Sequence, residues 1–221
     1  MTPSLAREAF DKNLADVSRL LEIHRDVSGD GPGRKYGVDV LNRSAVVLLC
    51  ASWEAYCEDI VGEVVAHFTE HAPAKNLPKK LREQIADEFG DGQMKMKMWS
   101  LADDGWKSVL SSRLDKYKEE RDRGLNTPKP EPVKKLFLEH AGYEDITQAW
   151  TWPKKTAEQA AKDLIALVEL RGSIAHRVDT SSPVNKGAVE RYMRIVGHLV
   201  EETDKEMQEH ALRVTGVAMR P

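Results

Sequence analysis

The stretch from Val38 to Ala72 constrains the fold most, because its pattern predicts one long helix that is apolar nearly all round in its middle. That middle runs from Ser44 to Trp53. A helix without a polar side belongs in the centre of a protein, where other helices cover it. We therefore expect an all-α bundle built around this helix.

Three further stretches have the amphipathic pattern of helices that pack on such a centre. The first follows Thr2, taken as the N-cap with Pro3 at the first helical position, and runs to about Arg25. The second begins after Thr156 as N-cap and runs to about Val178, and the third spans about 186–212. These stretches predict one domain, 1–221, with four to five main helices, core helices at about 2–72 and 153–213, and an irregular helical insertion at about 73–152.

The middle third differs from the rest in composition. It is rich in lysine and arginine, and it holds Trp99 and Trp106, so it has the basic and aromatic content that can hold single-stranded RNA. The interpretation we favour is a solvated helical insertion with its tryptophans in a small core. The alternation from Met94 to Met98 also fits a short strand, and its few residues leave that open.

Charge and hydropathy exclude several classes of protein. The formal net charge of −3 argues against non-specific coating of nucleic acid, so a polyanion would need a local basic patch. No apolar run reaches the roughly 18 residues that span a membrane. The first residues lack the pattern of a secretion signal, and Cys50 and Cys57 lie about 10 Å apart on one helix, too far for a disulfide. We expect a cytoplasmic protein with no membrane contact and reduced thiols.

A charged residue interrupts the apolar stripe of the predicted helix before Val178. Leu164, Leu167, Ile174 and Val178 recur at the spacing of a core-facing stripe, and Arg171 occupies a position within it. A guanidinium stays charged and is costly to bury alone, so it needs a carboxylate, a phosphate or a wet cleft. Gly172 follows inside the helix, where glycine costs about 1 kcal/mol relative to alanine.

His176 lies five residues after Arg171, and this cluster of residues predicts a functional site. The same spacing occurs between Arg19 and His24, within a regular amphipathic helix that has no such glycine. We expect that second pair to lie on the surface. Without other information, a structural histidine and a plain buried ion pair would be the favoured explanation of His176 and Arg171.

No residue pattern points to a metal or a cofactor. His67 and His71 are four residues apart, but no Glu-x-x-His pair and no His-Glu-x-x-His sequence occurs in the chain. We expect the pair to mark a helix end, and we expect no metal and no cofactor.

Two segments resemble the HEPN superfamily of helical-bundle ribonucleases and nucleotide-binding modules. One is Leu167-Val-Glu-Leu-Arg-Gly-Ser-Ile-Ala-His-Arg177, which has the Arg-x4-His spacing of the superfamily. The other, Leu48-Leu-Cys-Ala-Ser-Trp-Glu-Ala-Tyr-Cys-Glu-Asp-Ile60, is similar to the Ser-Trp-Glu-x-Tyr helix of the RiboL-PSP-type group. Many relatives carry a polar residue directly after the arginine. Here that position is Gly172, and the hydroxyl comes one residue later, at Ser173.

The resemblance implies a metal-independent endoribonuclease that acts as a homodimer on RNA, in a toxin–antitoxin or antiviral setting with an antitoxin or another defence partner. It implies catalytic roles for Arg171 and His176, with Ser173 in support. The alternative is an inactive HEPN module that serves as a dimerising adaptor or binds nucleotides or RNA. Residues five apart on an unbroken helix point about 140° from each other, so the pair meets only if the helix loosens at Gly172 or a second chain contributes. Glu54, on the central helix, is our candidate for pairing Arg171 in the resting state.

Overall fold

The computed structural model describes residues 2–29, 37–87, 101, 103–120, 127–176 and 184–220. These residues confirm the all-α bundle. The described part holds seven α-helices and no strand beyond an isolated bridge between Trp152 and Lys155. The helices are α1 (Leu5–Ser28), α2 (Asp39–His71), α3 (Lys79–Asp87), α4 (Gly105–Glu120), α5 (Pro130–Leu136), α6 (Ala157–His176) and α7 (Lys186–Thr215).

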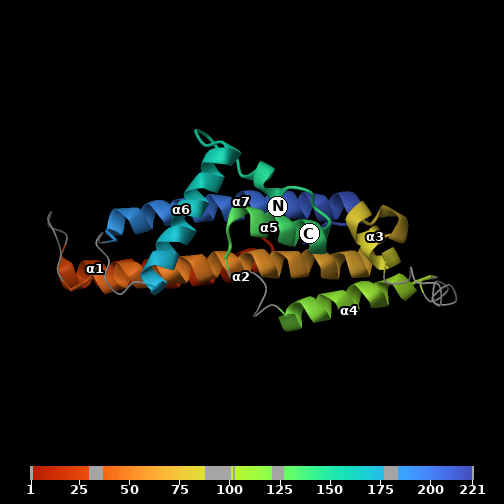
Figure 1. The fold of residues 1–221 in the computed structure, drawn as a ribbon, viewed down its shortest axis with the longest axis horizontal. Coiled ribbons are helices and arrows are strands. Elements are labelled where there is room, and N and C mark those ends of the chain that lie inside the picture. Colours follow the sequence, from red (N-terminus) through yellow and green to blue (C-terminus); the bar gives the residue numbers. More distant parts are fainter. Residues whose placement is uncertain are drawn as a thin grey trace.

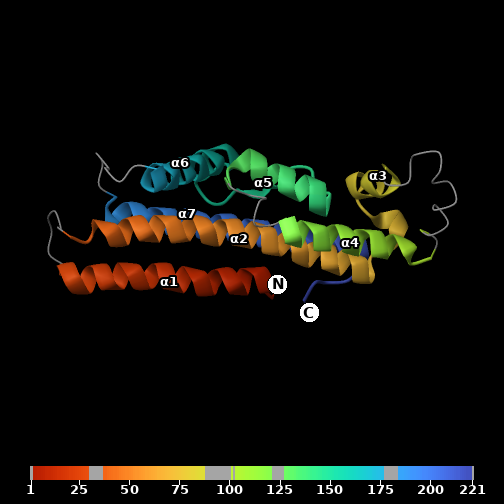
Figure 2. The ribbon, with the colours of Figure 1, turned by 60° about the horizontal axis from the view of Figure 1, so that its bottom comes forward.

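Helix α2 forms the centre of the bundle, as its apolar sequence predicted. The side chains of Trp53, Tyr56 and Phe68 are fully or almost fully buried. Figure 2 shows α1 on one side of the α2–α7 pair, and α6 with α5 on the other. In Figure 1, α1, α2 and α7 run roughly side by side, and α6 crosses over them at an angle. The long helices therefore bury α2 between them.

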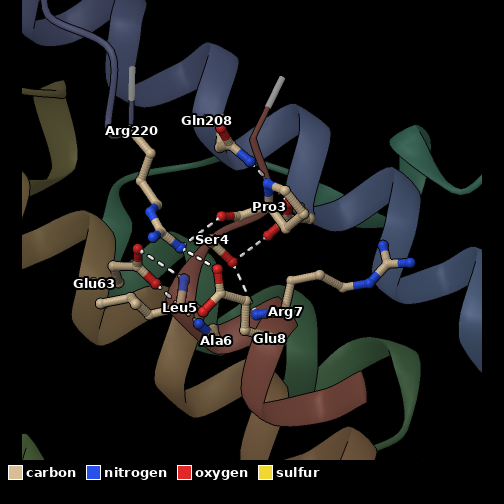
Figure 3. Close-up of polar contacts among 10 residues, drawn as sticks. Pro3, Ser4, Leu5, Ala6, Arg7, Glu8, Glu63, Gln208 and Arg220 are labelled. Carbon is tan, nitrogen blue, oxygen red and sulfur yellow. Dashed lines mark hydrogen bonds and ion pairs between the residues drawn. The ribbon is translucent and has the colours of Figure 1, made fainter. Parts of the chain in front are cut away.

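Helix α1 begins two residues later than the sequence predicted. The N-cap is Ser4 rather than Thr2, and its side chain accepts a hydrogen bond from the Arg7 amide at 3.0 Å. A residue of another helix makes this position the better one: the Glu63 carboxylate of α2 accepts from the amides of Leu5 and Ala6, at 3.2 and 3.1 Å (Figure 3). Three of the four amides that a helix start leaves without a partner are thus bonded to side chains.

The same corner holds both ends of the described chain to the bundle. The Ser4 hydroxyl donates to the buried Asp204 of α7, and Gln208 donates to the same carboxylate at 2.8 Å. Arg220 donates to the Pro3 carbonyl at 3.0 Å and to Glu8 at 2.6 Å (Figure 3). Because these bonds join residues some 200 positions apart, they fix α1 and the segment after α7 against each other.

The middle third packs on the bundle more closely than a solvated insertion would. Trp150 is fully buried and its indole donates to the Thr203 hydroxyl of α7 at 2.9 Å. The Trp53 indole of α2 donates to the Pro128 carbonyl at 3.2 Å. The expectation of a solvated insertion with a small core of its own is therefore wrong for the described residues, because their tryptophan and backbone partners lie on α2 and α7. Trp106 is buried in α4, whereas Trp99 and the alternation from Met94 lie outside the described residues.

The described residues also bear on the two cysteines, on membrane helices and on the His67–His71 pair. Cys50 and Cys57 are buried and make no disulfide, as expected. No helix in the described ranges has the length and hydropathy to cross a lipid bilayer. His67 bonds to Thr215 and to the Val217 carbonyl, at 3.3 and 3.1 Å, so this histidine joins the end of α2 to the end of α7. Within the same described ranges, no three potential ligands gather as a metal site would require.

Candidate active site

Helix α6 begins at the predicted cap and lies against α2. Thr156 accepts from the Gln159 amide at 3.3 Å, and the Gln159 side chain accepts from the Thr156 amide at 3.1 Å, the reciprocal arrangement of a capping box. Leu164 and Leu167 are fully buried. The Cys50 thiol of α2 donates weakly to the Leu167 carbonyl at 3.9 Å. These contacts fix α6 on α2 one turn before Arg171.

The apolar stripe of α6 leaves the core at Arg171. That residue is half-buried, and so is Ile174 one turn later. Among the described residues, no carboxylate lies within 4.0 Å of the guanidinium. Glu169, two residues earlier, pairs with Lys129 at 3.1 Å instead. Arg171 therefore holds a positive charge at the edge of the core that no carboxylate of the described chain neutralises directly.

Arg171 lies close enough to Glu54 and Cys50 of α2 for its charge to influence the pKa values of both groups. Burial raises the pKa of Glu54, and the positive charge of Arg171 works in the opposite direction. Burial also raises the pKa of the Cys50 thiol to about 12, again opposed by the charge of Arg171. The guanidinium thus acts on both groups, and Glu54 is near enough to interact with it without forming an ion pair within 4.0 Å.

A shallow groove opens between the first half of α2 and the end of α6, where Ile174, three residues after Arg171, forms part of its wall. Its volume is about 520 Å³, and its lining residues are Val40, Arg43, Ser44, Val47, Leu48, Ala51 and Ile174. Val40 and Val47 are unusually exposed for valines, at 54% and 38%. Arg43 pairs with Asp39 at 3.1 Å. This groove was not predicted from the sequence, although the two valines, seven residues apart, could have indicated an apolar face on the outside of α2.

The helix does not loosen at Gly172. Helix α6 is α-helical from Ala157 to His176, and a Cβ atom built on Gly172 would meet nothing within 4 Å. Packing within the chain therefore does not require a glycine here. The unbroken helix removes one of the two ways in which Arg171 and His176 could meet, and the other is a second chain.

The remaining predicted residues have different positions. Ser173 is exposed, and its hydroxyl donates to the Leu170 carbonyl at 2.7 Å. His176 is the last residue of α6, and its side chain lies outside the described residues, as does Val178. The structure thus brings Arg171 and Glu54 into one neighbourhood and leaves Ser173 engaged with its own helix.

Arg19 and His24, the second pair with this spacing, lie on α1. Arg19 is exposed and pairs with Glu22 at 2.8 Å. His24 is buried, with 7% of its surface exposed, and its Nδ1 lies 3.4 Å from the Ser28 hydroxyl. The expectation that this pair lies on the surface is right for the arginine and wrong for the histidine, which is buried near the end of α1.

Comparison with known proteins agrees with this architecture. The model of the family described as RiboL-PSP-HEPN matches residues 9–209, nearly the whole chain. The chain belongs to the RiboL-PSP-HEPN family. The match to this HEPN family includes the middle third, for which the sequence alone showed no resemblance, and membership indicates a nuclease or RNA-related function. The chain matches no curated protein and no solved structure.

Proposed function

We propose that this HEPN protein is a metal-independent endoribonuclease that acts as a homodimer. The observation that carries the proposal is Arg171, a half-buried residue whose guanidinium has no carboxylate of the described chain within 4.0 Å, on the same helix as Ile174, which lines the groove. A guanidinium binds the non-bridging oxygens of a phosphate bidentately and stabilises charge that grows on them. An RNA phosphate is a suitable partner for such a group.

The reaction needs only side chains of this kind. The 2′-hydroxyl of the RNA attacks the adjacent phosphorus, the bond to the 5′-oxygen of the next nucleotide breaks, and the products are a 2′,3′-cyclic phosphate and a 5′-hydroxyl. His176 accepts the proton of the 2′-hydroxyl or delivers one to the leaving 5′-oxygen, a role worth about 10²–10⁴ in rate. Arg171 stabilises the negative charge that grows on the non-bridging oxygens, with Glu54 and Ser173 in supporting roles. DNA lacks the attacking hydroxyl and is not cut.

The groove and the continuous helix support a dimer. Exposed Val40 and Val47 line the same groove as Ile174 of α6, and a second copy on this apolar surface would bring its own α6 close. Such a two-fold interface would supply the His176 that cannot meet Arg171 on one unbroken helix. The space above Gly172 leaves room for close approach of another chain or of the substrate.

Purified protein incubated with mixed RNA in EDTA tests the reaction. We expect cleavage to fragments with 2′,3′-cyclic phosphate and 5′-hydroxyl ends, lost in H176A and kept in H24A when rates are normalised to folded protein. A matched oligonucleotide with 2′-deoxyribose at every position should stay intact. Cleavage that survives H176A, or that needs a divalent metal, contradicts the proposal.

Mixing two inactive variants tests the shared site. If Arg171 of one chain works with His176 of the other, each R171A/H176A heterodimer has one intact site of two, and a refolded mixture recovers about one quarter of the wild-type rate. If both residues act within one chain, the mixture stays inactive. V47D should separate the dimer in sedimentation experiments, whereas V27D, at an exposed valine of α1, should leave it intact.

The exposed valines also favour a second candidate, a dimerising HEPN adaptor without turnover. A stable dimer that never cuts RNA in the assay above would establish it. We propose for the nuclease a toxin–antitoxin or antiviral setting, with a cognate inhibitor or defence partner. Toxicity on expression that R171A relieves would support this setting, and a harmless wild-type protein with full cleavage activity would contradict it.

A further inference from the structure

A second pocket lies between α6 and α7, away from the groove at α2. It is lined by Trp152, Lys155, Asp163, Arg191, Arg194, Ile195 and His198, and its volume is about 240 Å³. The turn before α6 provides Trp152 and Lys155, the beginning of α6 provides Asp163, and the first half of α7 provides the rest. Figure 1 shows α6 crossing over this part of α7.

Two arginines give this pocket a positive charge. Arg191 and Arg194 are exposed, and neither has a carboxylate within 4.0 Å in the part of the chain that the structure describes. Lys155 and Asp163 neutralise each other at 2.7 Å. Five other arginines of the described chain, in contrast, are in ion pairs: Arg7, Arg19, Arg43, Arg213 and Arg220. The pocket therefore keeps the charge of two guanidinium groups, one turn apart on α7.

An aromatic pair forms another part of the wall. The Trp152 and His198 rings are stacked, with centroids 4.9 Å apart and planes at 19°. A tight turn holds the tryptophan in place: the Lys155 amide donates to the Trp152 carbonyl at 2.9 Å, and the Trp152 amide donates to the Lys155 carbonyl at 3.3 Å. Lys154, within this turn, has a φ of 70°, a left-handed conformation that is unfavourable for a lysine.

We infer that this pocket binds phosphates of the same RNA strand whose scissile phosphate Arg171 holds, an inference that rests on the proposed function. Arginines without a carboxylate partner, beside flat aromatic rings, are the features with which proteins hold single-stranded nucleic acid. Helix α6 connects the two places, because Asp163 at the pocket and Arg171 are eight residues, or about 12 Å, apart along it. The strand would thus follow α6 from the groove to the pocket.

Binding of a short single-stranded oligonucleotide with 2′-O-methyl groups, which cannot be cut, tests the inference. The full chain carrying R191A and R194A is compared with the wild type by fluorescence anisotropy over a range of salt concentrations. We expect about tenfold weaker binding at 0.1 M salt. The slope of log K against log salt should fall by about 1.4, since each phosphate contact with a single strand contributes about 0.7. R213A, which removes an exposed and paired arginine near the other end of α7, should change neither quantity.

The outcomes separate this inference from the proposed function. Equal affinities and slopes for the double variant and the wild type overturn the inference, and so does a wild-type protein that does not bind the oligonucleotide. If the wild type cuts RNA through His176 and either result holds, the proposed function stands alone. If the double variant shows the lower slope and the wild type never cuts RNA, the pocket stands and the nuclease fails.

Discussion

Helices α1 and α6 each carry an arginine and a histidine five residues apart, and the two pairs differ in nearly every other respect. Arg19 points away from the core and pairs with Glu22, whereas Arg171 continues a buried stripe and has no such carboxylate in the described chain. His24 is buried against α1's own last turn, and His176 ends its helix. The spacing is the same, so the surroundings of the arginine distinguish a candidate site from an ordinary helix.

The largest expected effect is on RNA cleavage. R171A should lower the rate by at least about 10²-fold, because it removes the charge that stabilises the reacting phosphate. R19A removes an exposed arginine of the same spacing and should leave the rate within about twofold. Initial rates on one RNA substrate in EDTA measure both. If R171A and R19A lost the same fraction of the cleavage rate, Arg171 would have no special role compared with Arg19.

Replacing Gly172 and Gly142 by alanine should change the free energy of unfolding in opposite directions. G172A should raise the free energy of unfolding by about 1 kcal/mol, since alanine favours a helix and its Cβ meets nothing within 4 Å. G142A should lower it by about 2–4 kcal/mol, because Gly142 has a φ of +65° and its Cβ would lie 2.4 Å from that of Pro78. Urea unfolding of the wild type and both variants measures the changes. A destabilised G172A monomer would contradict the open surroundings of Gly172.

The pKa of Glu54 reports the charge of Arg171. Burial raises the pKa of this carboxyl above its ordinary value of 4.5, and Arg171 lowers it, so the pKa should rise further in R171A and stay unchanged in R19A. A carboxyl with a raised folded-state pKa contributes stability below its unfolded pKa and loses it as pH rises through the folded one. R171A should therefore shift this loss to higher pH. Carbon-detected NMR titration of Glu54 measures the pKa, and no difference between R171A and R19A would show that the two groups do not interact.

The smallest effect should come from Ser173. S173A removes a hydroxyl that donates to the Leu170 carbonyl on an exposed face, so the free energy of unfolding should change by less than about 0.5 kcal/mol. Because Ser173 has a supporting role, the variant S173A should lower the rate of RNA cleavage by less than about tenfold. S18A on α1 is the matched control, because the Ser18 hydroxyl donates in the same way to the Leu14 carbonyl. A hundredfold loss of rate in S173A would instead make this serine a main participant.

Local sequence patterns predicted the long helices, because apolar periodicity and capping residues act over a few positions. Thr156 with Gln159 is such a case. The start of α1 could not be predicted in this way, since Glu63 of another helix decides it. For the same reason the packing of the middle third was missed, because Trp150 finds its hydrogen-bond partner on α7.

The candidate site shows the same division. The interruption of an apolar stripe by Arg171 was visible in the sequence, and the structure places this residue at the edge of the core. The second pocket was not visible, because its tryptophan and its arginines come from segments that only the tertiary fold brings together. Features within one helix were thus predictable, whereas among features that need two helices only the nearness of Glu54 to Arg171 was predicted.

The two buried thiols have a practical consequence for experiments on this protein. Burial raises the pKa of Cys50 to about 12 and that of Cys57 well above its usual range, so thiolate is scarce at both positions near neutral pH. Alkylating reagents and maleimide dyes should therefore leave the native protein unmodified. A cysteine introduced at exposed Val47 could then be labelled or cross-linked selectively, with the natural sequence otherwise intact.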